Sequence, residues 1–265
     1  MKVVLFCGGL GTRLGGGANG VPKPMVEIGY RPILWHLMKY YAHYGHKDFI
    51  LCLGYKADVI KNYFLNYNEY ISNDFTMSKG NVKLHAEKGD IADWNITFVD
   101  TGLNANIGQR LKAVEKYLED EEIFLANYTD GLTDLPLTKM ISFFMNSGKI
   151  ACFLSAKPSQ TFHVVTMKNE NMVEKIEYVR DTDIIINGGF FVFNRSIFQY
   201  MQEGEELVIE PFNRLINEGQ LISYRYDRYW CMDTFKEHQE LTDIYNQGNA
   251  PWEVWKEKRG SATIR

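Results

Sequence analysis

Residues 1–13 read MKVVLFCGGLGTR, and this stretch decides how the chain begins to fold. The apolar run Val3–Phe6 predicts a buried strand, which ends at the glycine-rich segment Gly8-Gly9-Leu10-Gly11-Thr12-Arg13. A strand that leads into a glycine turn lets backbone N–H groups approach a polyphosphate with no side chains in the way. Two basic residues, Arg13 and Lys23, can meet the phosphate charge. Arg13 offers a planar guanidinium that binds phosphate with two hydrogen bonds, and Lys23, which lies between two prolines, offers a point charge. The pattern indicates a nucleoside triphosphate site.

Two other phosphate-binding patterns do not fit this stretch. No Gly-Lys-Ser/Thr follows at the spacing of a P-loop. No glycine or alanine at the sixth position opens a helix, as a dinucleotide fingerprint requires. An ordinary tight turn is the structural alternative, and the two basic residues favour the phosphate site over it.

Composition narrows the class of protein. The chain has 265 residues and a net charge of −4, which argues against a nucleic-acid binder. No apolar run reaches the ~20 residues of a membrane helix, and the apolar start is too short for a signal peptide. We therefore expect a cytoplasmic protein with no membrane partner. Four scattered cysteines form no CxxC pair, which predicts reduced, buried thiols: Cys7, Cys52, Cys152 and Cys231.

Strand-like and helix-like segments alternate through the first half of the chain. Predicted strands are Val3–Phe6, Phe49–Leu53, Ile96–Val99 and Ile123–Tyr128, and predicted helices are Ile33–Tyr44, Asp58–Phe64 and Leu111–Leu118. This alternation is typical of a parallel sheet with right-handed crossovers.

The second half carries short strands separated by turn signals, which suggests a mixed or antiparallel extension. Predicted strands are Ala151–Ser155, Phe162–Met167, Val173–Tyr178, Gly189–Asn194 and Leu221–Arg225, and predicted helices are Ile197–Tyr200 and Ile209–Glu218. No linker separates the halves, so we expect one domain over residues 1–265. Its fold class is α/β: a Rossmann-like, mostly parallel mixed sheet flanked by helices, with a small antiparallel extension.

Aromatic side chains are dense on two of the predicted helices and just after them. They form either core or a subunit interface. They are Tyr40, Tyr41, Tyr44, Tyr63, Phe64 and Tyr67.

Ligands of open parallel sheets bind beyond the carboxyl ends of the strands. Thr129-Asp130-Gly131 follows a predicted strand directly, and an acid there suits Mg²⁺ bridging nucleotide phosphates, although alone it is more often an ordinary turn. A second acid, Asp233, interrupts the apolar run Trp230-Cys231-Met232. We expect both acids to converge with Lys23 as a metal and phosphate site.

These segments together resemble the sugar-phosphate nucleotidyltransferases, and more specifically the glucose-1-phosphate cytidylyltransferase family. The resemblance spans nearly the whole chain. It rests on the glycine segment with Arg13 and on these motifs: Pro22-Lys23-Pro24-Met25-Val26-Glu27-Ile28-Gly29, Pro32-Ile33-Leu34-Trp35-His36, Gly54-Tyr55-Lys56, Trp94-Asn95-Ile96-Thr97, Val99-Asp100-Thr101-Gly102, Ile186-Asn187-Gly188-Gly189-Phe190-Phe191, Met232-Asp233-Thr234 and Ala250-Pro251-Trp252.

The resemblance implies a role for each matching residue. The triphosphate would be wrapped by Gly8, Gly9, Gly11, Thr12 and Arg13, with Lys23 on the α-phosphate. The cytosine and its phosphates would lie near Thr101, Gly102 and Arg110. Mg²⁺ would be held by Asp130 and Asp233, and the acceptor pocket would be lined by Asn187 and Gly189. It further implies a nucleotidyltransferase (GT-A-like) fold and a homo-oligomer. Residues 1–135 would mainly bind the nucleotide and residues 136–265 the acceptor.

The implied reaction needs alignment and positive charge rather than a base. A phosphate oxygen of the acceptor attacks the α-phosphorus of CTP in line, and pyrophosphate leaves. A phosphate monoester, with a second pKa of about 6, is already mostly anionic at pH 7. Mg²⁺, Lys23, Arg13 and Asp130 would therefore be the catalytic set.

The acceptor-side motifs depart from the family. Its Glu-Lys-Pro lysine is replaced by Tyr178, or by Val179 if one gap is allowed, and only a shifted backbone would let Lys175 or Arg180 compensate. The Gly-Arg-Phe-Gly turn is replaced around Gln160-Thr161-Phe162-His163.

Drift is one interpretation of these changes, and an acceptor other than glucose 1-phosphate is the other. We favour the second, because both metal acids are kept. A relative that joins CTP to phosphorylated glutamine in capsular phosphoramidate synthesis fits this pattern. His163 would then contact the new acceptor together with Tyr178, or else be a structural histidine. A glucose-1-phosphate enzyme is the alternative within the family. A non-catalytic nucleotide sensor, the alternative outside it, would be expected to lose Lys23 or an acid.

Overall fold

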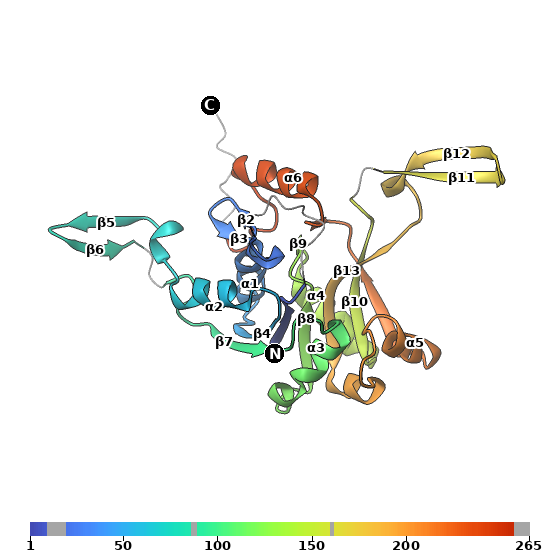
Figure 1. Cartoon of the computed structure of the whole chain (residues 1–265), viewed down its shortest axis with the longest axis horizontal. Helices are drawn as coiled ribbons and strands as arrows, with labels where there is room; N and C mark the ends of the chain where they lie inside the picture. Colours follow the sequence, from blue (N-terminus) through green and yellow to red (C-terminus); the bar gives the residue numbers. More distant parts are fainter. Residues whose placement is uncertain (10–19, 86–88, 160–161, 257–265) are drawn as a thin grey trace.

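The computed structural model describes residues 1–9, 20–85, 89–159 and 162–256. Its centre is a seven-stranded sheet in the order β14-β10-β13-β8-β1-β4-β7 (Figure 1). Only β13 runs antiparallel to its neighbours β8 and β10, and the other adjacent pairs are parallel. The strands are β1 (Val3–Phe6), β4 (Asp48–Leu53), β7 (Asn95–Asp100), β8 (Ile123–Asn127), β10 (Ala151–Ala156), β13 (Ile186–Asn194) and β14 (Leu221–Arg225).

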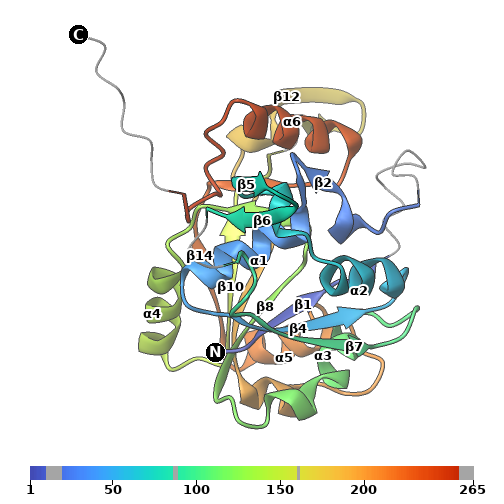
Figure 2. The same cartoon turned by 90° about the vertical axis from the view of Figure 1, so that its left-hand side faces the viewer.

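Helices cover both faces of this sheet, so its central strands are buried throughout, as an apolar run without alternation predicts. In β1, Val3 and Leu5 belong to the buried cluster that contains residues of α1, α2, α4 and α6, whereas Val4 and Phe6 belong to the cluster that contains residues of α3 and α5. The helices are α1 (Ile33–His43), α2 (Ala57–Leu65), α3 (Ile107–Ala113), α4 (Leu137–Ser147), α5 (Glu210–Asn217) and α6 (Phe235–Asn246). Figure 2 shows the layers from the side, with α1 above the strands β1, β4 and β7 and with α3 and α5 below them.

Four short antiparallel pairs lie outside the main sheet: β2 (Glu27–Ile28) with β3 (Arg31–Pro32), β5 (Phe75–Ser78) with β6 (Asn81–Leu84), β9 (Gly131–Thr133) with β15 (Tyr229–Cys231), and β11 (His163–Asn169) with β12 (Met172–Tyr178). The β5–β6 and β11–β12 hairpins project from opposite ends of the molecule (Figure 1). Five 3-10 helices complete the described elements: η2 (Lys23–Met25), η3 (Glu69–Ile71), η4 (Glu115–Leu118), η5 (Val179–Asp181) and η6 (Arg195–Tyr200).

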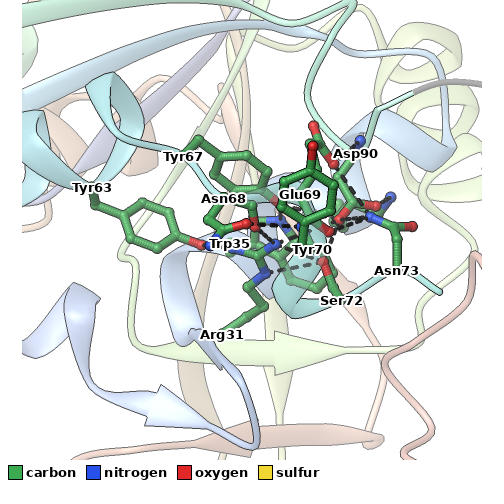
Figure 3. Close-up of polar contacts among 11 residues, drawn as sticks. Arg31, Trp35, Tyr63, Tyr67, Asn68, Glu69, Tyr70, Ser72, Asn73 and Asp90 are labelled. Carbon is green, nitrogen blue, oxygen red and sulfur yellow. Dashed lines mark hydrogen bonds and ion pairs between the residues drawn. The ribbon is translucent and has the colours of Figure 1, made fainter. Parts of the chain in front are cut away.

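The β5–β6 arm is fixed to the body at both of its ends by Arg31. This arginine is 2% exposed, and its guanidinium stacks 4.2 Å from the ring centre of Tyr67. It donates to the Asn68 carbonyl (2.7 Å) where the arm departs, and to Ser72 Oγ. Where the arm returns, Asp90 accepts hydrogen bonds from Ser72 (2.5 Å) and Tyr67 (3.1 Å), as Figure 3 shows. The arm therefore leaves the body in one defined direction.

The α/β fold class predicted from the sequence is confirmed, with some differences in the elements. The predicted helix Leu111–Leu118 is divided, because α3 ends at Ala113 and Val114 leaves helical geometry (φ −101°, ψ 1°) before η4. The predicted helix Ile197–Tyr200 is the 3-10 helix η6. The sequence analysis missed α4, α6 and the β2–β3, β5–β6 and β9–β15 pairs.

Burial bears on two predictions about side chains. All four cysteines are buried and free, as predicted. Of the predicted aromatic surface, Tyr40 and Tyr41 are core, and the Tyr40 hydroxyl donates to the Leu135 carbonyl (2.7 Å). The other four aromatic residues are half-buried: Tyr44, Tyr63, Phe64 and Tyr67. Within the part of the chain that the structure describes, no helix combines the length and apolar character needed to cross a membrane.

Candidate functional site

Lys23, Asp130 and Asp233 come together, although they lie far apart in the sequence. Lys23 Nζ lies 2.7 Å from Asp130 Oδ2, and the same ammonium pairs with Asp233 Oδ1. Lys23 opens η2, where Pro22 and Pro24 on either side restrict the backbone. The three side chains lie beyond the carboxyl ends of the parallel strands, where ligands of open α/β sheets bind.

Backbone pairing holds the two acids in place. Asp130 follows β8, and the preceding Thr129 hydroxyl donates to the Phe6 carbonyl of β1 (2.9 Å). The Asp130 carbonyl accepts from the Met232 N–H (2.8 Å), next to the β9–β15 pair. Strand pairing therefore places Asp233 beside Asp130, in addition to the ion pairs that both acids form with Lys23.

Glu237 of α6 fixes the backbone at Asp233. Its Oε2 accepts from the N–H groups of Asp233 (2.7 Å) and Thr234 (2.8 Å), while the Thr234 hydroxyl accepts from the Glu237 N–H. This capping box begins α6 directly after Asp233. The sequence analysis missed Glu237, although Thr-x-x-Glu is a recognisable helix-start pattern.

The electrostatics of the cluster follow from burial and from opposite charge. Burial by itself lowers the pKa of Lys23, but Asp130 and Asp233 outweigh it, so the pKa is raised above its ordinary value. Burial raises the pKa of Asp130, and the Lys23 ammonium offsets this only in part. Lys23 is therefore fully charged at neutral pH and occupies the space between two carboxylates.

The two acids fit a divalent cation. Both carboxylates bind one ammonium, so they lie close enough together to share a cation. Among the described residues no group of three or more His, Cys, Asp or Glu side chains surrounds a metal position. Two carboxylates suit Mg²⁺, which completes its shell with water and substrate phosphates rather than with a full protein cage.

On the nucleotide side, three predicted residues surround the guanidinium of a fourth, Arg110. Arg110 of α3 donates to the carbonyls of Gly8 (3.1 Å) and Gly102 (3.0 Å) and to Thr101 Oγ1 (2.7 Å). Gly9 has open space where a side chain would be. Gly11, Thr12 and Arg13 lie outside the described residues, so their predicted roles stay predictions.

The predicted acceptor residues fall into two separate groups. Asn187 and Gly189 lie on β13 next to Tyr128, which precedes Thr129 and Asp130. Asn187 Oδ1 accepts from the Gly189 N–H (2.9 Å), and the Gly189 carbonyl accepts from the Tyr128 N–H (3.2 Å). This group therefore adjoins the acids through β8.

His163 and Tyr178 form the second group, at the base of the projecting β11–β12 hairpin. They are cross-strand partners with ring centres 4.4 Å apart. Arg180 stacks on the Tyr178 ring at 4.9 Å, and Lys175 pairs with Glu177 out on the hairpin. Residues 160 and 161 of the altered turn lie outside the described residues.

A protein-family model described as Nucleotidyl transferase matches residues 2–236. This chain belongs to the nucleotidyltransferase family. This nucleotidyltransferase is 39% identical over 259 residues to the glucose-1-phosphate cytidylyltransferase of Salmonella typhimurium (strain LT2), covering 97% of this chain and 100% of that protein. It is 38% identical over 260 residues to the probable glucose-1-phosphate cytidylyltransferase of Bacillus subtilis (strain 168), covering 96% and 100%. The resemblance identified from the motifs is thereby confirmed.

Solved structures of distant relatives share the fold of this nucleotidyltransferase. UTP-bound UGPase from Acinetobacter baumannii superimposes with a TM-score of 0.66 at 17% identity, covering 93% of each chain. HddC from Yersinia pseudotuberculosis gives a TM-score of 0.64 at 20% identity, covering 92% of this chain and 99% of that one. At such identities the likeness shows the fold alone, and it agrees with the mixed, mostly parallel sheet.

Proposed function

We propose that this nucleotidyltransferase transfers CMP from CTP to the phosphate of glucose 1-phosphate, forming CDP-glucose and pyrophosphate. The observation that carries the chemistry is the cluster of Lys23 with Asp130 and Asp233. The substrates are supported by the 39% identity to a glucose-1-phosphate cytidylyltransferase across 97% of this chain.

The proposed reaction is an in-line displacement that needs no general base, because the acceptor phosphate is already mostly anionic at pH 7. The acceptor phosphate oxygen forms the new bond to the α-phosphorus as the bond to the leaving pyrophosphate breaks. The Lys23 ammonium, which pairs with both carboxylates, would meet the charge that develops on the α-phosphate. Mg²⁺ held by Asp130 and Asp233 would supply charge neutralisation for the phosphates. Asp130 and Asp233 would hold and orient the cation, and they would transfer no proton.

Phosphorylated glutamine is a second candidate acceptor, because of Tyr178. Where the family's motif has an acceptor lysine, this chain presents an aromatic pair, His163 with Tyr178, and the neighbouring Lys175 is turned to Glu177 on the hairpin. The close relatives favour glucose 1-phosphate over our expectation of an altered acceptor, so the amino-acid phosphate takes second place.

Pyrophosphate release tests the two acceptors directly. Purified protein is supplied with CTP and Mg²⁺ and with glucose 1-phosphate, other sugar 1-phosphates, alcohol phosphates or glutamine phosphate in turn. Turnover on glucose 1-phosphate supports the main proposal. No turnover on glucose 1-phosphate, together with turnover on glutamine phosphate, supports the second acceptor. Binding of CTP without turnover on any acceptor would support the non-catalytic sensor. Replacing CTP with UTP or dTTP tests whether the enzyme prefers cytosine as the nucleobase of its substrate.

The resemblance also supports a homo-oligomeric cytoplasmic enzyme, with CTP and a phosphorylated small molecule as its ligands. Two projecting hairpins with exposed apolar side chains offer surfaces for self-association. Ile176 on β12 is 60% exposed, and Met77 on β5 is 69% exposed. The oligomer is tested by molar mass in solution.

A further inference from the structure

Arg110 is a buried cation whose hydrogen bonds, in the described part of the chain, go to no carboxylate. The residue is 3% exposed, and burial lowers the pKa of its guanidinium. Its hydrogen bonds go to four backbone carbonyls and one hydroxyl: Gly8 O (3.1 Å), Leu53 O (3.1 Å), Gly102 O (3.0 Å), Leu103 O (3.4 Å) and Thr101 Oγ1 (2.7 Å). The carbonyl dipoles are its hydrogen-bond partners, and the nearby Asp100 carboxylate also favours its charged form.

These acceptors belong to three different loops. Gly8 follows β1, Leu53 ends β4, and Thr101 to Leu103 follow β7. The strands β1, β4 and β7 are adjacent and parallel, so their carboxyl ends form one continuous edge. A single planar fork therefore connects the whole nucleotide-side edge of the sheet.

The loops close around the guanidinium too tightly for a ligand to lie against it. A methyl group on Gly8 would overlap the guanidinium, and one on Gly54 would come within 2.9 Å of Nη1. Glycine at both positions is what lets the backbone approach. The Thr101 hydroxyl accepts from Arg110 and donates to the Leu53 carbonyl (2.8 Å), which joins the β4 and β7 loops directly.

The direction of each carbonyl that bonds Arg110 also fixes the direction of the N–H group in the same peptide. In a planar trans peptide, the C=O and the following N–H point in opposite directions. With the Gly8 carbonyl directed at Arg110, the Gly9 N–H points away from it. With the Gly102 carbonyl directed at Arg110, so does the Leu103 N–H. Outward N–H groups on glycine-rich loops are donors for phosphate and base oxygens.

We propose that Arg110 is a positioning residue of the CTP site. It contacts no phosphate. It fixes the loops after β1, β4 and β7 so that the backbone N–H groups of Gly9 and Leu103 face the nucleotide. This role rests on the proposed function and corrects the expectation that Arg110 itself touches the phosphates. Lysine cannot replace it, because an ammonium is a point charge with no planar fork to meet acceptors on three loops.

The test is nucleotide binding by calorimetry, with cytidine and CTP as the probes. The variants are Arg110→Lys, Thr101→Val and the pair combined. Arg195→Lys is the matched control, because Arg195 is a half-buried arginine that likewise bonds a backbone carbonyl, that of Glu119 (3.2 Å). We expect Arg110→Lys, which keeps the charge, to weaken both cytidine and CTP about tenfold or more, since the loops that hold the nucleoside move. Thr101→Val should weaken both by about threefold or more, and the double variant should lose less than the product of the two.

Direct phosphate contact predicts a different result. Arg110→Lys would then retain most of the CTP affinity, and cytidine binding would be unchanged. Either finding would overturn the positioning role, as would fully multiplicative losses in the double variant. If Arg110→Lys fails to fold, Thr101→Val alone decides: a loss of cytidine affinity supports the role, and wild-type affinity overturns it. In turnover, the KM for CTP should rise while the KM for the acceptor stays the same.

The binding experiment separates this proposal from the proposed function. Wild-type protein that binds CTP but transfers CMP to no acceptor would refute the proposed reaction and leave the role of Arg110 open to the same variants. Wild-type protein that binds neither cytidine nor CTP would overturn both.

Discussion

Lys23 Nζ lies 2.7 Å from Asp130 Oδ2, so the lysine expected on the α-phosphate occupies the position expected for a metal. Its ammonium also pairs with Asp233. Without such a counter-charge the two carboxylates would repel each other in a partly buried site. We therefore expect Lys23 to compete with a divalent cation before nucleotide binds, and to contribute its charge to the reaction afterwards.

Lys23→Met should separate these two roles. We expect the variant to bind Mn²⁺ without nucleotide about tenfold more tightly than the wild type, because no ammonium has to be displaced from Asp130 and Asp233. Turnover should fall about 100- to 1,000-fold, as for the loss of one preorganised charge of about 3–4 kcal/mol. Electron paramagnetic resonance of free Mn²⁺ measures the first effect and pyrophosphate release the second.

Lys47→Met is the matched control for this variant. Lys47 forms an exposed ion pair with Asp93 (2.5 Å) away from the cluster, so its removal should change neither measurement. A Lys23→Met protein whose Mn²⁺ affinity is equal to or weaker than that of the wild type would contradict the competition between ammonium and metal.

Gly189→Ala should destabilise the acceptor side of the site. Gly189 has a φ of +74°, and an added methyl would lie 2.5 Å from the Tyr128 ring. We expect a loss of about 2–4 kcal/mol in unfolding free energy, from backbone strain together with overlap in a packed interior. Urea denaturation measures it.

Gly219→Ala provides the comparison, because φ is +61° there but nothing lies within 4 Å of an added methyl. This variant should lose only the strain contribution, about 1 kcal/mol. Equal losses in the two variants would mean that the contact with Tyr128 has no energetic weight.

Stability should decrease below neutral pH because of His36. The ring is 1% exposed, its Nε2 donates to the Ile28 carbonyl (2.9 Å), and burial lowers its pKa to about 4. Between pH 4 and about 6.5 the unfolded chain binds a proton that the folded chain does not, so unfolding free energy rises with pH. From pH 7 to pH 4 the loss from this residue is about 3 kcal/mol.

His36→Gln should therefore show a flatter dependence of unfolding free energy on pH than the wild type over this range. The absolute stability at pH 7 is not the readout, since the variant also changes packing. The pKa of His46 is likewise lowered to about 4, and its contribution remains in both proteins. Parallel pH curves for wild type and variant would show that His36 does not titrate as its burial requires.

The sequence predicted the central sheet well because its strands are short apolar runs with distinct boundaries. The predicted strand Val3–Phe6 matches β1, and Leu221–Arg225 matches β14. The prediction that Lys23 lies near Asp130 followed from one physical rule, that ligands bind beyond the carboxyl ends of parallel strands, whereas Asp233 is brought there by the antiparallel β9–β15 pair. That rule needs only strand ends, which an apolar run defines.

What the sequence did not show depends on tertiary contacts. The β5–β6 arm has exposed residues on both strands and no apolar periodicity, and what fixes it is Arg31, distant in sequence from Asp90. Helices α4 and α6 were missed although their signals are present. Leu137, Met140, Ile141 and Phe144 follow helical spacing, and Thr234 opens a capping box.

Arg110 shows the same limit at the site. Its motif placed it near the nucleotide, but only the structure shows that its guanidinium bonds the loop carbonyls. An arginine near a nucleotide suggests a contact with phosphate. Motif spacing does not reveal that the partners of this arginine are backbone carbonyls.

The β11–β12 hairpin should mediate self-association. Val165 and Ile176 are cross-strand partners and are 47% and 60% exposed, so this hairpin has almost no core of its own. A two-stranded hairpin is at best marginally stable in water by itself, and clustered exposed apolar residues mark an interface. Ile176→Glu should therefore lower the molar mass measured by light scattering at a given concentration. Thr166→Glu places the same charge at an exposed polar position beside Lys175 and should leave the mass unchanged. If both variants keep the wild-type mass, the hairpin lies outside the interface, and a monomeric wild type would refute self-association itself.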